Sequence, residues 1–111
     1  SVSDVDSSVL RERKLLSDDG VVSIALAISK QGAMMAQPVV SAMGFLYDSE
    51  HAKIEAACRQ HAANMVTRTI SSGKKVKDAV ASGQMQGQMR SFLYEKTKRR
   101  PVVLINLIEV E

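Results

Sequence analysis

A proline between a helix-like segment and an almost wholly apolar segment, late in the chain, constrains the fold more than any other feature. Phe92 and Leu93 follow Met85 and Met89 at helical spacing, which predicts an amphipathic helix. Pro101 has no backbone N–H and its ring clashes with the preceding helical turn, so this helix must end before it. The chain therefore passes from helix to another kind of structure within a few residues.

The residues after this proline predict a β-strand. From Val102 to Ile108 every residue is apolar except Asn106, so apolar side chains would point to both faces of the strand. Strands of this kind are usually central in a sheet or covered on both sides. We therefore expect a buried strand here.

The segment after Gly20 predicts a β-hairpin with one bulky and one small face. Large apolar residues alternate with small ones, which is the two-residue period of a strand: Val22, Ile24, Leu26 and Ile28 against Ser23, Ala25, Ala27 and Ser29. The small face either accepts another surface closely or is simply a shallow exposed face. A tight connection at residues 30–32 leads to a strand-like run over residues 33–47, interrupted by Pro38 and Gly44. Because a proline favours an edge position, we expect this second strand at the edge of the sheet.

Two helices are expected between the hairpin and the last strand. Asp48 is a suitable N-cap, and a stripe of residues at spacings of three and four follows over about five turns: Ile54, Ala57, Cys58, His61, Ala62, Met65, Val66 and Ile70. A Ser-Ser-Gly sequence at residues 71–73 ends this helix. The second helix begins at about Asp78, because lysines are unfavourable at a helix start. Gly83 and Gly87 either mark close packing against the first helix or weaken the first half of the second one.

These elements make the fold class α+β, with two layers and the order β-β-α-α-β. A chain of 111 residues is large enough for one domain with a modest core. Residues 1–17 mix serine and aspartate with isolated apolar residues and a short helical stretch. We expect residues 1–17 to form a linker or arm and residues 18–111 to form the domain.

No constellation of residues that would support catalysis is present in the sequence. Metal-dependent hydrolysis needs clustered ligands, whereas the only histidines are His51 and His61, about 80° apart around a helix. His61 and Cys58 lie on the apolar stripe, where we expect packing roles for both. We therefore expect no catalytic, cofactor-binding or metal-binding residue, and no enzymatic activity of this chain alone.

The apolar runs of the chain are also too short to cross a membrane. None approaches the roughly 20 residues that a spanning helix needs, and no segment resembles a signal peptide. The sequence therefore predicts a cytoplasmic protein, or a piece of one, without a membrane partner.

Three basic clusters are candidates for contact with RNA. They are Arg11, Arg13 and Lys14; Lys74, Lys75 and Lys77; and Lys96, Lys98, Arg99 and Arg100. Two clusters on one face would follow a phosphate backbone with salt-dependent affinity, although the favoured interpretation is that each is a solvated loop or helix end. The net charge of +3 permits a polyanionic partner without demanding one. The third cluster is the best candidate, because the adjoining strand would hold it rigidly.

Three longer segments resemble the C-terminal part of the ribonuclease J family in order and spacing. They are VLRERKLLSDDGVV at residues 9–22, GFLYD at residues 44–48 and FLYEKTKRRPVV at residues 92–103. The resemblance covers essentially the whole chain and implies a small three-stranded sheet covered by two helices. Two positions depart from the family pattern: Ile105 stands where many members are expected to have proline, and Asp6 where glycine is expected.

The resemblance also implies what the parent protein does. In that family a metallo-β-lactamase domain with an inserted β-CASP domain hydrolyses RNA, endonucleolytically and from the 5′ end, in messenger decay and ribosomal RNA maturation. A divalent metal, zinc or similar, is expected in that catalytic region, and its ligand motifs do not occur in this sequence. For this chain the resemblance implies a supporting role beside the catalytic domains of the parent.

Two supporting roles follow from these observations. The first is assembly of a homo-oligomer, through an exposed sheet face or edge and a methionine-bearing helix surface. The second is contact with RNA through Lys98, Arg99 and Arg100. The small charge excess and the apolar strands favour assembly. An unrelated small α+β protein with its own ligand is the remaining alternative.

Overall fold

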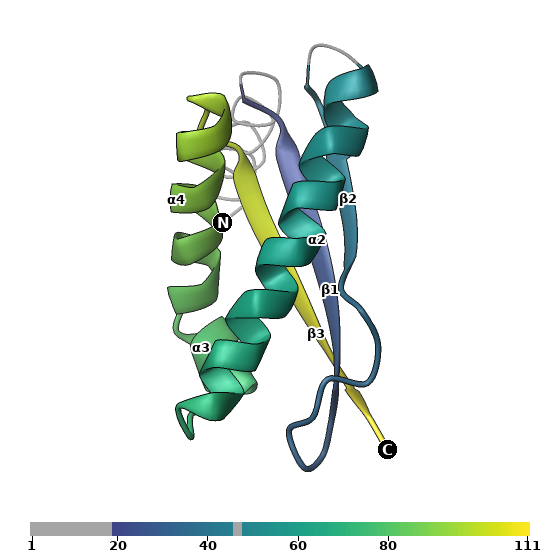
Figure 1. The fold of residues 1–111 in the computed structure, drawn as a ribbon, viewed down its shortest axis with the longest axis vertical. Coiled ribbons are helices and arrows are strands. Elements are labelled where there is room, and N and C mark those ends of the chain that lie inside the picture. The colour runs from purple at the N-terminus through teal and green to yellow at the C-terminus, as the bar shows by residue number, and fades with distance from the viewer. Residues whose placement is uncertain (1–18, 46–47) are drawn as a thin grey trace, which may run out of the picture.

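The computed structural model describes residues 19–45 and 48–111. Their elements follow in the order β1 (Val21–Ser29), β2 (Val39–Met43), α2 (Asp48–Ser71), α3 (Val76–Ala81), α4 (Gln84–Thr97) and β3 (Val102–Val110). The three strands form one sheet, and the helices pack against one face of it (Figure 1). The predicted α+β class and the two-layer order of elements are confirmed.

β1 is the central strand of the sheet, whose order is β2-β1-β3. β2 is antiparallel to β1, with Val40 opposite Ile24, and β3 is parallel to β1, with Ile105 opposite the same residue. A parallel pair needs a long crossover connection, and the three helices lie on it. Pairing begins directly after the proline, because the N–H of Val102 donates to the carbonyl of Gly20 at 3.1 Å.

The core lies between the helices and the bulky face of β1, as the alternating pattern predicts. Val22, Ile24 and Leu26 are at most 1% exposed. They meet the buried stripe of α2, which consists of Ile54, Cys58, Ala62, Met65 and Val66, and the buried residues of α4, which are Met85, Met89 and Leu93. The first helix occupies the predicted residues, although its last apolar residue, Ile70, is 41% exposed.

The second strand of the hairpin is at the edge, as predicted, but it is much shorter than residues 33–47. It begins directly after Pro38, because a residue without an N–H cannot take part fully in the ladder. The connection before it is closed by backbone hydrogen bonds, among them one from Met35 N–H to the carbonyl of Ala27 at 2.8 Å. Residues 46–47 of the predicted strand lie outside the described residues.

The prediction of a buried last strand is wrong. β3 is an edge strand in the described sheet, and Leu104 and Ile108 are 50% and 52% exposed. One face of β3 packs toward the helices through Val103 and Ile105, while no described helix covers the other. The apolar residues on one face of this strand therefore pack toward the helices, whereas those on the other face are exposed.

The predicted second helix is divided into α3 and α4. The division falls at Gly83, which has a φ of 81° and precedes the first turn of α4. A left-handed residue interrupts the α-helical ladder, and glycine adopts this conformation readily. Neither glycine marks packing against α2: a Cβ on Gly83 would meet nothing within 4 Å, and one on Gly87 would meet only the side chain of Arg90, at 3.6 Å.

Candidate interaction surfaces

The face of the sheet away from the helices is exposed in the described part of the chain. We call it the open sheet face and define it by nine residues: Ser23, Ala25 and Ala27 of β1, Val39, Ser41 and Met43 of β2, and Leu104, Asn106 and Ile108 of β3. Val39 and Met43 are 67% and 56% exposed, similar to the two large apolar residues of β3. The open sheet face is therefore apolar on both of its flanks.

The shape and charge of the open sheet face follow from the strand register. Ala25 lies between Val39 and Asn106, and Ala27 lies beside Ile108. A row of small residues on the central strand is thus flanked by rows that carry larger side chains. None of the nine residues is charged, although the chain as a whole carries a net charge of +3.

The helix methionines do not contribute to an exposed surface. Met65, Met85 and Met89 are at most 2% exposed and pack in the core. The predicted methionine-bearing helix surface is therefore wrong, because the methionine positions of α2 and α4 are those that face the sheet. Met35 and Met43, which belong to the hairpin, are the methionines that are more than half exposed.

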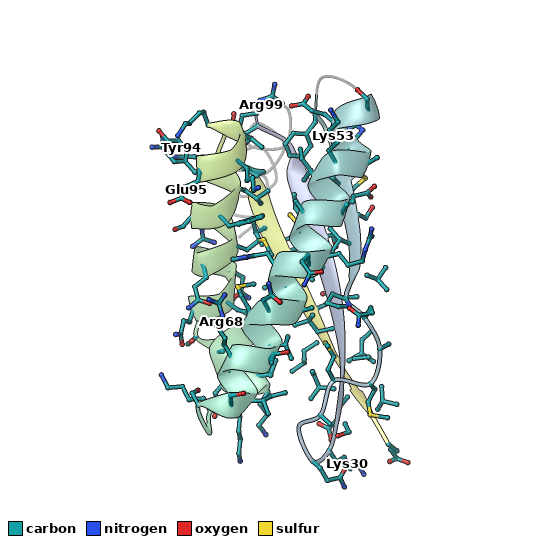
Figure 2. All side chains as sticks on the ribbon, in the orientation of Figure 1. Lys30, Lys53, Arg68, Tyr94, Glu95 and Arg99 are labelled. Carbon is teal, nitrogen blue, oxygen red and sulfur yellow. The ribbon has the colours of Figure 1, made fainter. Side chains whose placement is uncertain are left out.

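Arg99, from the third basic cluster, is engaged inside the fold. Its Nη1 lies 3.4 Å from Oε1 of Glu50, at the start of α2. Its guanidinium also lies over the ring of Phe45, 5.8 Å from the centroid. This residue joins the end of α4 to the start of α2, as its position in Figure 2 shows. Its charge is therefore partly neutralised within the domain.

Lys98 and Arg100 surround an exposed tyrosine. Nζ of Lys98 lies 5.5 Å and Cζ of Arg100 lies 4.8 Å from the centroid of the Tyr94 ring. Tyr94 is 40% exposed on the outer side of α4 (Figure 2). We call these three residues the basic aromatic corner. Lys98 has a φ of 59° as it ends the helix, and this bend brings both charges back toward the ring.

Lys96 belongs to a separate stack of side chains between α4 and α2. Its Nζ lies 5.6 Å from the centroid of Phe92, whose ring stacks on that of His61 at 4.0 Å. Burial, and to a smaller extent the charge of Arg68, lower the pKa of His61. His61 thus stays neutral more readily than an exposed histidine, which suits a packing role.

Lys74 and Lys75 lie at the other end of the domain, at the connection from α2 to α3, and Lys77 lies in the first turn of α3. These three lysines line a groove together with Lys30 of the hairpin. Figure 2 shows Lys30 at the end of the domain opposite Tyr94 and Arg99. The second and third predicted clusters therefore do not meet. The first cluster, Arg11, Arg13 and Lys14, lies outside the described residues.

Lys30 is a member of this basic groove that sequence reasoning missed. It is far from residues 74–77 in the chain, and a single lysine in a hairpin turn gave no signal. The order of the elements was the one available signal. A helix that crosses from one strand to a parallel neighbour runs back along the sheet, so it ends near the hairpin turn that follows the central strand. That inference required the strand order, which the sequence did not provide.

The cysteine is held in an unreactive state. Burial raises the pKa of the Cys58 thiol to about 11, and the side chain is fully enclosed. A thiol with so high a pKa is a poor nucleophile at neutral pH, because the thiolate is the reactive form. Within residues 19–45 and 48–111 no three His, Cys, Asp or Glu side chains are grouped to hold a metal ion. No helix in these ranges is long and apolar enough to span a membrane.

The sequence matches a known family over nearly its whole length. The model of the ribonuclease J C-terminal domain covers residues 8–110. The chain belongs to the ribonuclease J C-terminal domain family. This match confirms the predicted resemblance. It begins before the predicted domain boundary at residue 18, which lies outside the described residues.

Curated relatives of this ribonuclease J C-terminal domain are several times longer. Ribonuclease J 2 of Streptococcus pyogenes serotype M3 is 34% identical, over 99% of this chain and 20% of that protein. Ribonuclease J2 of Bacillus subtilis is 30% identical, over 98% of this chain and 20% of that protein. Ribonuclease J 1 of the same Streptococcus pyogenes strain is 30% identical, over 93% and 18% respectively. The chain therefore spans about 20% of the length of these relatives.

Proposed function

We propose that this ribonuclease J C-terminal domain is a non-catalytic module that assembles copies of a longer ribonuclease through the open sheet face. The parent would cleave RNA in a metallo-β-lactamase/β-CASP region, endonucleolytically and from the 5′ end, in cytoplasmic messenger decay and ribosomal RNA maturation. A divalent metal, zinc or similar, would be held in that region. The names of the relatives support the ribonuclease part of this proposal.

The open sheet face is the observation that carries the assembly role. Contiguous exposed apolar surfaces on soluble domains commonly mark interfaces. Because the face carries no charge, two copies of this basic chain can approach through it without like charges meeting. The bulky flanks of one copy can also enter the row of small residues on the β1 strand of the other. A second copy is therefore the partner that suits this surface.

Adding charge to the open sheet face is expected to weaken self-association strongly. We expect the 111-residue chain to associate reversibly in sedimentation experiments over a wide concentration range. The double variant Leu104→Glu and Ile108→Glu should weaken association at least about tenfold, which corresponds to about 1.4 kcal/mol. The reason is that four carboxylates would meet at the interface of two copies.

The control for this experiment carries the same added charge on another surface. Ala52 and Ala56 are exposed on α2, on the opposite side of the sheet, so Ala52→Glu with Ala56→Glu should leave association unchanged. Equal weakening by both double variants would show a non-specific effect of net charge. A chain that stays monomeric at every concentration would contradict the assembly role.

Contact with RNA remains a second candidate function, and the basic aromatic corner is the observation that favours it. Exposed aromatic rings stack on bases, and neighbouring cations bind phosphate groups. Tyr94, Lys98 and Arg100 place one ring and two cations within a few ångströms of each other. Arg99 contributes less to such a site, because Glu50 already pairs with it.

Removing the two cations of the corner should weaken RNA binding if this second function holds. For Lys98→Gln with Arg100→Gln, we expect the slope of log affinity against log salt to become shallower by about 0.7 for each phosphate group that is no longer neutralised. Fluorescence anisotropy with a 5′-monophosphorylated single-stranded RNA measures this slope. The matched control is Arg59→Gln with Arg90→Gln, two exposed residues on the outer helix surfaces. An identical slope for both variants would exclude the corner as an RNA-binding surface.

A further inference from the structure

We infer that the basic groove at the α2–α3 end of the domain is a docking site for a partner peptide with an aliphatic anchor residue flanked by carboxylates. The groove has a volume of about 370 Å³. It lies on the helix side of the sheet, at the end where β1 and β3 extend toward the α2–α3 connection (Figure 1). It is therefore separate from both the open sheet face and the basic aromatic corner.

The floor of the groove is aliphatic. Ile28 and Leu107 come from adjacent strands, whereas Ile70 and Val76 come from the two sides of the α2–α3 connection. Ile70 is 41% exposed, which leaves its side chain available to a ligand. A floor of this kind binds a branched aliphatic side chain through burial of apolar surface.

The charged residues that line the groove are mainly cationic: four lysines and one carboxylate, that of Glu109. Lys74 and Lys75 come from the α2–α3 connection, Lys77 from the start of α3, and Lys30 from the hairpin. Nζ of Lys30 pairs with Oε1 of Glu111 at 3.1 Å, but both groups are largely exposed, so this pair contributes little. No carboxylate in the described ranges forms an ion pair with the other three lysines. Four ammonium groups around one groove repel each other, and the carboxylates of a ligand would relieve that repulsion.

The lining favours a peptide over a nucleic acid. Single-stranded nucleic acids bind where aromatic side chains stack on bases, and no aromatic residue lines this groove. A nucleic acid would use the lysines but would leave the aliphatic floor without a partner. An acidic peptide with one aliphatic anchor would use both the lysines and the aliphatic floor. Its carboxylates would pair with the lysines, and its anchor side chain would fill the floor.

The test begins with selection of short random peptides on the 111-residue chain. We expect the enriched peptides to share a leucine, isoleucine, valine or methionine next to two or more acidic residues. Fluorescence anisotropy then measures the affinity of an enriched peptide. The triple variant Lys74→Gln, Lys75→Gln and Lys77→Gln should weaken binding at least about tenfold, and Ile70→Ser should do so by a similar factor.

The controls separate this site from a general effect of positive charge. The triple variant Lys53→Gln, Arg59→Gln and Arg90→Gln removes the same charge from exposed helix positions outside the groove and should leave peptide affinity unchanged. Circular dichroism melting of every variant verifies folding. Binding that is insensitive to the groove variants, or selection without an acidic and aliphatic pattern, would overturn the proposal.

Two further measurements distinguish other occupants of the groove. An oligouridylate that competes with the peptide, and whose own binding is unaffected by Ile70→Ser, would identify a phosphate site instead. Weaker self-association of the lysine variant in sedimentation would identify a second copy of this chain as the occupant. Either result overturns the peptide proposal. The assembly role is tested independently by the variants of the open sheet face.

Discussion

Leu93→Ala is expected to lower the free energy of unfolding by about 3 kcal/mol, because it removes buried methyl groups and leaves a cavity. Leu93 is 1% exposed on α4 and belongs to the cluster that joins the helices to the sheet. For a domain of this size the loss corresponds to a fall of about 12 °C in melting temperature. Urea unfolding monitored by circular dichroism measures the effect directly.

Leu104→Ala is the matched control, because it makes the same chemical change on the open sheet face. Leu104 is 50% exposed, so its truncation should cost less than about 1 kcal/mol when the chain is monomeric. The measurement therefore belongs at low protein concentration. Similar losses for the two variants would mean that another part of the protein buries Leu104 in solution.

Gly20→Ala is expected to be nearly as destabilising, with a loss of about 3 kcal/mol, from strain and overlap together. Gly20 has a φ of +85°, and a Cβ at this position would lie 2.9 Å from the carbonyl oxygen of Met43 and 2.9 Å from the ring of Phe45. The glycine carbonyl also accepts the hydrogen bond from Val102 that starts the β1–β3 pairing. A shift of the backbone here would therefore disturb both neighbours of the central strand.

Gly32→Ala isolates the contribution of strain. Gly32 has a φ of +91°, but a Cβ there would meet no atom within 4 Å. Its replacement should cost about 1–2 kcal/mol, the usual penalty for an L-residue with a side chain in a left-handed conformation. Chemical denaturation of both variants gives the difference. Equal losses at the two positions would show that Phe45 moves aside without cost.

Local periodicity explains most of what the sequence predicted correctly. The alternation from Val22 to Ile28 identified the buried face of β1, and the stripe from Ile54 to Val66 identified the buried face of α2. In both segments the period follows directly from backbone geometry, which is local. The fold class and the order of elements follow from the same signal.

The errors arose where the outcome depends on distant parts of the chain. Leu104 and Ile108 are apolar on a face that no described helix covers, and the strand itself does not reveal which of its faces is covered. The division at Gly83 was missed for a local reason. A glycine inside a helix costs only about 1 kcal/mol relative to alanine. The presence of a glycine in the sequence therefore does not indicate whether the helix continues through that residue or is interrupted there.

The candidate surfaces were likewise predicted only in part from the sequence. Lys98, Arg99 and Arg100 were identified as a cluster because they are neighbours in the chain, but only the structure separates the engaged Arg99 from the two residues around Tyr94. Lys30 joins Lys74 only through the position of the hairpin beside the α2–α3 connection. Charge clusters are visible in sequence, whereas their orientation and their distant members are not.

The parallel pairing of β1 with β3 also determines when this domain can fold as it is synthesised. Val21 pairs with Val102 and Ser29 pairs with Val110. The second neighbour of β1 in the sheet is therefore β3, the last strand of the chain. As the chain emerges from the ribosome, β1 must wait, with one edge unpaired, until β3 has followed. Closing so long a loop is slow compared with forming a hairpin. The hairpin and α2 can therefore form during synthesis, while the complete sheet forms only after β3 has left the ribosome.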